Sequence, residues 1–307
     1  MNQLLFWILF NLFVLGMLAL DLGFFQRASH TVKFRGALAW TLTWIGLAGA
    51  FALLVYFHYG HATAVEFVTG YVIELSLSVD NLFIFILVFR FFRVAPEHQH
   101  KVLFWGIVGA LVMRAIFIVV GISLMQRVHW ITYIFGALLV YSGIKLFYQH
   151  EGGTEPQNNP VLRLFRHWVP TTEDYEGDKF VVRRGRFYAT PLLAVLVLVE
   201  ATDLILATDS IPAVLAITIK PFIVYTSNVF AVLGLRSMYF LLAGMMEVFH
   251  YLHYGLAAIL IFVGVKMLVA NYYPIPTLAA LGVVAGVLLI SVLASVLNPQ
   301  SQTQGPA

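Results

Sequence analysis

Long apolar runs, separated by short charged or Pro/Gly-rich breaks, dominate the chain. A membrane crossing needs about 20 apolar residues. On that basis the breaks predict nine helical segments, at residues 2–25, 37–58, 64–91, 102–124, 129–148, 188–208, 222–246, 251–270 and 274–297. The runs are continuous rather than alternating, which argues against a transmembrane β-barrel. The first run lacks a basic stretch and a small-residue cleavage site, so we expect a retained span. The pattern therefore predicts an all-α polytopic membrane protein, folded as a single transmembrane domain over residues 1–307.

Composition supports this class and excludes several others. Hydrophobic residues make up 61% of the chain and charged residues 11%, and the mean hydropathy is +0.88. Soluble domains are about half apolar and a quarter charged, so a soluble fold is nearly excluded. The chain contains no cysteine, which excludes disulfides, thiolate metal sites and cysteine nucleophiles. It also carries no nucleophile or cofactor motif in a supporting context, and we do not expect an enzyme.

Basic side chains gather in every second loop. The first and third loops hold three each and the fifth loop, residues 149–187, holds six, whereas the second holds none and the fourth and sixth hold one each. By the positive-inside rule, loops one, three and five face the cytoplasm and the N-terminus lies outside. We expect a multi-pass protein of the cytoplasmic (inner) membrane that does not bind nucleic acid. The fifth loop reads as a partly disordered solvated linker, with a regulatory or partner-binding loop as the alternative.

Two segments share one pattern of polar residues. The third segment reads IELSLSVDNLFIF from Ile73, and the sixth reads TDLILATDSIPAV from Thr202. Aligned together with the segments that follow them, they pair Glu74 with Asp203, Asp80 with Asp209, Asn81 with Ser210, Arg114 with Arg236, Gly143 with Gly264 and Lys145 with Lys266. Rare charged residues seldom recur in order by chance, so we predict two repeats, residues 64–148 and 188–270. Two helices (1–60) precede them and one (274–297) follows.

The predicted repeats are inverted relative to each other. Each contains three spans, and an odd number of crossings reverses the second copy in the membrane. Inverted repeats are typical of secondary transporters, which bind substrate between the repeats near the membrane midplane.

The spans contain five acids and two arginines at central positions. They are Glu74, Asp80, Glu200, Asp203 and Asp209, with Arg114 and Arg236 as the expected counterions. An ionised acid at the centre of a membrane helix costs roughly 2.5–3.5 kcal/mol, so these acids must be compensated. If all ionise, the arginines leave an excess of negative charge. A bound cation would supply the missing charge; the alternative is a structural network of protonated or fully hydrogen-bonded acids.

The side chains in this region offer hard oxygen ligands, which suit Mn²⁺, Ca²⁺ or Mg²⁺. We expect the ligands to come from Glu74, Asp80, Asn81, Glu200, Asp203 and Asp209, supported by Ser78, Ser210, Arg114 and Arg236. Crowded carboxylates also bind protons, so metal binding would release protons and provide a route to coupled transport.

Helical spacing separates the acids within each segment. At about 100° per residue, Glu74, Ser78 and Asn81 share one stripe, whereas Asp80 lies about 120° away from Glu74. Asp203 and Asp209 diverge in the same way. Pro212 removes a hydrogen bond to the carbonyl of residue 208, so we predict a break or widened turn near residues 207–212.

The strings VIELSLSVDNLFIF and VEATDLILATDSIPAVLAI, with LDLGFF from Leu20, resemble the TerC family of integral membrane proteins, especially the branch typified by Alx. The resemblance extends to about Asn271. It implies Mn²⁺ export and a plan similar to the LysE-type cation exporters, which also carry three-plus-three repeats. The acidic motifs of the family fall on the six ligand positions named above. The residues alone indicate only a hard divalent cation.

Two functions of different classes follow. The first is a secondary transporter that exports a divalent cation, with Mn²⁺ as the substrate implied by the resemblance and protons as the exchanged ion. The second is a non-transporting membrane scaffold that helps other membrane proteins to insert or assemble. The sequence fixes neither the ion among Mn²⁺, Ca²⁺ and Mg²⁺ nor the oligomeric state.

Overall fold

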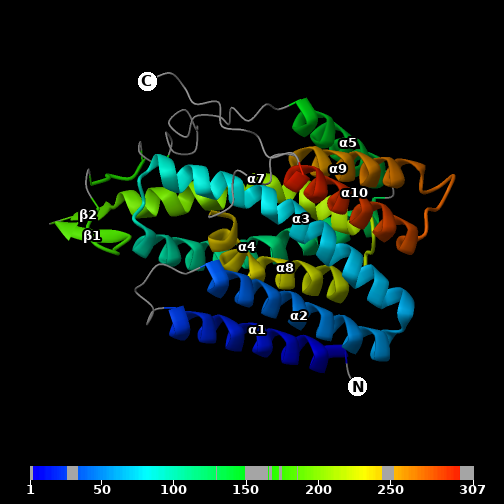
Figure 1. Cartoon of the computed structure of the whole chain (residues 1–307), viewed down its shortest axis with the longest axis horizontal. Coiled ribbons are helices and arrows are strands. Elements are labelled where there is room, and N and C mark those ends of the chain that lie inside the picture. The colour runs from blue at the N-terminus through cyan, green and yellow to red at the C-terminus, as the bar shows by residue number, and fades with distance from the viewer. Residues whose placement is uncertain are drawn as a thin grey trace.

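The computed structural model describes residues 3–25, 34–128, 130–148, 165, 168–172, 175–184, 186–243 and 252–297. Within them the chain forms nine long helices and one two-stranded hairpin (Figure 1). The helices are α1 (Gln3–Phe25), α2 (Phe34–Tyr59), α3 (His61–Phe91), α4 (Pro96–Arg127), α5 (Ile131–Tyr148), α7 (Pro191–Leu215), α8 (Pro221–Ala243), α9 (Leu252–Val269) and α10 (Thr277–Leu297). The hairpin joins β1 (Val181–Arg184) to β2 (Arg186–Ala189).

These helices have the length and composition of membrane spans. Seven of them are long and apolar enough to cross a membrane, and α1 and α9 contain shorter apolar stretches, Leu4–Leu20 and His253–Val269. The predicted all-α polytopic class is therefore confirmed. The number of crossings and the inverted repeat stay predictions.

The helices run side by side in an elongated bundle (Figure 1). The helices α1 and α2 form one edge, and α5, α9 and α10 form the other. Between these edges α3 packs on α7 and α8, and α4 also packs on α7 and α8. Most side chains of α3 and α8 are buried by neighbouring helices, whereas most side chains of α2, α5 and α10 are exposed or only partly buried. Polar groups carried by α3 and α8 are therefore shielded by protein.

The sixth predicted segment ends too early, and the predicted break at residues 207–212 is wrong. The helix α7 continues through Asp209 to Leu215 with Pro212 inside it. Pro212 lies in the last turn, so the carbonyl of residue 208 loses its helical donor, but any bend would redirect only the few residues that follow. The turn after the proline is also closed: the Ala216 amide donates to the Pro212 carbonyl over 2.9 Å, and Lys266 Nζ donates to the Ala216 carbonyl over 3.0 Å.

The end of the predicted fifth loop is ordered, which the composition of residues 149–187 did not indicate. Its hairpin follows a segment that docks on the turn between α3 and α4. Tyr175 Oη donates to the Phe92 carbonyl over 2.7 Å, and Lys101 Nζ lies 2.9 Å from Asp178 Oδ2. The hydrogen bond from Lys101, with its positive charge, lowers the pKa of Asp178. Residues 149–164 lie outside the described part of the chain, so the expectation of disorder there stays a prediction.

Contacts at the opposite end of the bundle join other loops. Lys220, between α7 and α8, lies 3.0 Å from Glu66 near the start of α3. Asn271 Nδ2, after α9, donates to Tyr133 Oη near the start of α5 over 2.7 Å. The two ends thus group the loops as the alternation of basic residues predicts. Which end faces the cytoplasm stays a prediction.

Candidate functional site: a buried charge network between four helices

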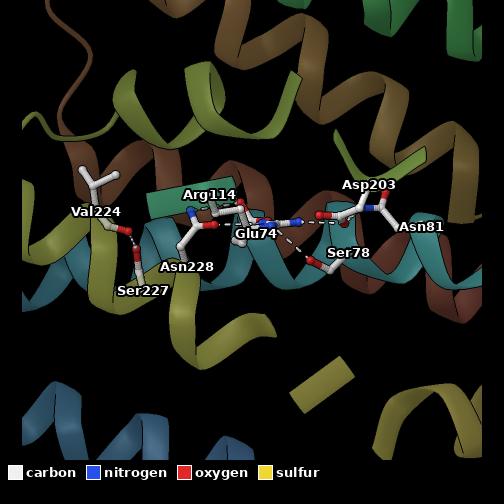
Figure 2. Close-up of polar contacts among 8 residues, drawn as sticks. All are labelled: Glu74, Ser78, Asn81, Arg114, Asp203, Val224, Ser227 and Asn228. Atoms are coloured by element: carbon white, nitrogen blue, oxygen red, sulfur yellow. Dashed lines mark hydrogen bonds and ion pairs between the residues drawn. The ribbon is translucent and has the colours of Figure 1, made fainter. Parts of the chain in front are cut away.

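One buried network joins α3, α4, α7 and α8. Arg114 of α4 forms an ion pair with Glu74 of α3 and a second one with Asp203 of α7, whose Oδ1 lies 3.3 Å from Arg114 Nη2. Arg114 Nη1 also donates to Asn228 Oδ1 of α8 over 2.8 Å. The exposed fraction of these four residues does not exceed 4%. Figure 2 shows the guanidinium between the two carboxylates.

Neutral side chains hold the two carboxylates in place (Figure 2). Asn228 Nδ2 donates to Glu74 Oε2 over 3.2 Å, and Ser78 Oγ donates to Glu74 Oε1 over 3.4 Å. Asn81 Nδ2 donates to Asp203 Oδ1 over 3.3 Å. The predicted stripe of Glu74, Ser78 and Asn81 therefore faces the network as expected.

The network contains more acidic than basic groups. Glu74 and Asp203 contribute two carboxylates against the single guanidinium of Arg114. Buried charges are stable only when they are paired and hydrogen-bonded. If both acids are ionised, the network is one positive charge short of neutral. This composition can accommodate an additional cation.

Glu200 adds a third acid beside the network. It lines a cavity of about 10 Å³ whose walls come from α3, α4, α7 and α8 and also include Asp203. A space of about 10–15 Å³ holds one water molecule. Glu200 Oε1 is buried and has no hydrogen-bond partner in the described part of the chain. A Cβ atom at Gly109 would overlap this carboxylate, so the missing side chain of Gly109 makes the space that Glu200 occupies.

Asp209 lies on another face of α7. It accepts a hydrogen bond of 2.7 Å from Ser142 Oγ of α5, whereas Asp203 faces α4. This agrees with the predicted divergence of the two aspartates on one helix. The nearby Ser210 is buried, and its Oγ has no partner among the described residues.

Two further predicted residues are only partly placed. Asp80 belongs to the unbroken helix α3, but its side chain lies outside the described residues. Arg236 of α8 is buried, and its Nη2 lies 3.4 Å from His100 Nδ1 of α4. The expected pairing with membrane acids is thus present for Arg114, and for Arg236 it stays a prediction.

The predicted ligands do not form one coordination shell in this conformation. Among the described side chains, which omit that of Asp80, no three His, Asp or Glu residues are close enough to hold a metal ion. The sequence identified the charged members of the network but not Asn228, Gly109 or Ser142. The one available signal for Asn228 was a lone amide in a strongly apolar segment.

The fold and the network define a polytopic helical membrane protein whose charged residues face one another inside the bundle. The family model named Integral membrane protein TerC family matches residues 59–303. The chain belongs to this family, which confirms the resemblance seen in the two acidic strings.

Relatives cover almost the whole chain. An uncharacterized membrane protein of Myxococcus xanthus, STKORF319, is 47% identical over 305 residues, covering 98% of this chain and 96% of that protein. Alx of Escherichia coli strain K12, named as a candidate membrane-bound redox modulator, is 44% identical over 299 residues, covering 94% and 92%. An uncharacterized membrane protein of Rickettsia bellii is 39% identical over 293 residues, covering 95% and 97%. No solved structure matches the chain.

Proposed function

We propose that this protein is a secondary transporter that exports a divalent metal cation, with Mn²⁺ as the first candidate. The observation that carries the proposal is the shortage of positive charge in the network: the single guanidinium of Arg114 pairs with the carboxylates of both Glu74 and Asp203. Charged groups inside a membrane protein are costly and therefore mark ion pathways. The oxygen atoms of the network are hard ligands, which favour Mn²⁺, Ca²⁺ or Mg²⁺ over soft metals.

The position of Glu200 supports a path to the network. Its cavity also touches Asp203, and its wall residues lie in the halves of α4 and α7 nearest the hairpin. On the predicted orientation this is the cytoplasmic half, from which an exporter takes its substrate. A metal ion that reached Asp203 would compete there with protons, which gives the proposed coupling to a proton gradient.

The name of Alx bears on this proposal. Thiol–disulfide chemistry needs cysteine, and these 307 residues contain none. A redox effect of this chain would therefore act through another molecule or ion and not through thiols of its own. Export of a redox-active metal ion such as Mn²⁺ is a route that the buried carboxylates support.

Flux measurements on reconstituted protein test the proposal. Liposomes containing the purified protein and a Mn²⁺-quenched dye are expected to show Mn²⁺ flux that depends on a pH gradient. Asp203→Asn is expected to lower the flux at least about tenfold, because it removes a carboxylate from the pathway. Asp178→Asn is the matched control: it removes an acid that is exposed outside the bundle, and the flux should be unchanged.

The result can contradict the proposal in two ways. Flux in Asp203→Asn equal to that of the wild type would show that the network is not the transport site. Absence of flux in the wild type under either gradient direction would favour the scaffold function.

A further inference from the structure

The guanidinium of Arg114 occupies the place where the network would bind a cation. Its two terminal nitrogens contact Glu74, Asp203 and Asn228 at once. Its remaining nitrogen, Nε, is buried without a hydrogen-bond partner in the described part of the chain. The arginine is thus held through its terminal nitrogens, by the oxygen atoms that could bind a metal ion.

We propose that Arg114 is an internal cation that exchanges with the transported ion. This inference rests on the proposed function and specifies its mechanism. In the conformation described, the guanidinium occupies the metal-free site. An incoming divalent cation displaces it and takes over Glu74, Asp203 and Asn228 Oδ1 as ligands. When the ion leaves, the guanidinium returns.

The charges of the site favour a divalent ion in this exchange. With Arg114 in place, the two ionised carboxylates leave one net negative charge. A divalent cation in place of the guanidinium brings the site to neutrality, whereas a monovalent cation would only restore the resting charge. A buried site gains most from the ion that neutralises it, because burial penalises uncompensated charge.

Asn228 can serve both states without rotating its side-chain amide. Its Oδ1 accepts from Arg114 over 2.8 Å, and its Nδ2 donates to Glu74 Oε2 over 3.2 Å. When the guanidinium leaves, the same Oδ1 is free to bind a metal ion, while the amide still holds Glu74. Departure of Arg114 thus exposes three oxygen ligands, from three different helices, at one point.

Equilibrium binding of Mn²⁺ to the purified protein tests the displacement directly. Arg114→Lys keeps the positive charge, but an ammonium is a point charge and cannot span both carboxylates as a planar guanidinium does. We expect the Kd for Mn²⁺, measured from the electron paramagnetic resonance signal of the free ion, to fall about tenfold. Arg127→Lys is the matched control, an exposed arginine at the end of the same helix, and should keep the wild-type Kd. An unchanged Kd in Arg114→Lys, or an equal change in Arg127→Lys, would overturn the proposal.

A second variant keeps the test decisive if the lysine protein is unstable. Arg114→Ala is purified with low-millimolar guanidinium chloride, which refills the space. We expect added guanidinium to weaken Mn²⁺ binding competitively in this variant and to leave binding by Arg127→Ala unaffected. Failure of guanidinium to compete would count against displacement.

Transport assays then separate this inference from the proposed function. An empty site without its internal cation should return slowly across the membrane, so Arg114→Ala should retain exchange of labelled Mn²⁺ for unlabelled Mn²⁺ while its net flux falls at least about tenfold. Equal loss of exchange and net flux would contradict the inference. If the wild type moves no Mn²⁺ at all, the proposed function fails, while the binding measurements still decide whether Arg114 and Mn²⁺ compete.

Discussion

Gly109 controls the room that Glu200 has beside the charge network. A Cβ atom at Gly109 would overlap the Glu200 carboxylate, the movable end of a flexible side chain. Gly109→Ala should therefore fold normally but displace that carboxylate, and a shift of about 1 Å in a precisely positioned group can reduce a rate severely. We expect the Mn²⁺ flux to fall roughly tenfold with little change in the thermal unfolding temperature.

The same helix offers a matched control for this variant. A Cβ atom at Gly106 would lie 3.6 Å from Val199 Cγ1 and 3.8 Å from Glu200 Oε1, which are ordinary contacts. Gly106→Ala should therefore transport like the wild type. Equal losses in both variants would mean that α4 tolerates no added methyl group, and Glu200 would lose its special role.

At the level of residues, the charged members of the network could be predicted from the sequence, whereas the neutral residues that hold them in place could not. Ionisable side chains are so rare inside these spans that Glu74, Arg114 and Asp203 could be identified without a structure. Gly109 carries no such signal, because glycines are ordinary in membrane helices, and the lone amide of Asn228 is a weaker signal than a charge. Their importance depends on which atoms of other helices lie opposite them, and a single sequence does not contain that information.

At the level of elements, glycines set the approach of α5 to α9. A Cβ atom at Gly264 would lie 2.7 Å from the Gly136 carbonyl oxygen, and one at Gly143 would lie 2.8 Å from the Ala257 carbonyl oxygen. The alignment that pairs Gly143 with Gly264 also pairs Gly136 with Ala257, so the two contacts exchange under the predicted repeat. A two-fold axis between α5 and α9 would produce this relation. It supports the inverted repeat, which stays a prediction.

Gly264→Val should separate these two helices. The added side chain meets backbone atoms, which cannot move aside, and overpacking of this kind costs about 1–3 kcal/mol. We expect a lower thermal unfolding temperature in detergent. Gly286→Val in α10 adds the same side chain where no atom lies within 4 Å, and should unfold like the wild type. Equal unfolding temperatures of the two variants would show that the close approach of α5 and α9 does not stabilise the bundle.

Hydrophobic patterning predicted the existence of the helices better than their ends. The apolar runs correspond to the nine long helices of the described chain because membrane helices must satisfy their own backbone. The end of α7 was missed because the effect of Pro212 depends on its distance from the helix end, which was unknown. The hairpin β1–β2 was missed because its charged strands do not alternate, and its docking depends on contacts with the distant turn after α3.

At the level of the whole molecule, the direction of the charge network in the membrane follows from the predicted orientation. Contacts of Glu66 with Lys220 place two loops at one end of the bundle, and contacts of Tyr175 with Phe92 place the hairpin segment at the other. The Glu200 cavity is nearer the hairpin end. If that end is cytoplasmic, Glu200 lies on the side from which an exporter takes up its substrate.

The absence of cysteine makes this orientation directly measurable, because single cysteines can be introduced without removing any. We choose Ala62 and Tyr272 at one end and Val181 in β1 at the other, all exposed. A membrane-impermeant maleimide should label Ala62→Cys and Tyr272→Cys in intact cells, and should label Val181→Cys only after the membrane is opened. The unmodified protein controls for background labelling. The reverse labelling pattern would show the opposite orientation, with Glu200 nearer the outer side of the membrane. The same network would then load from outside, and the proposed direction of transport would change from export to import.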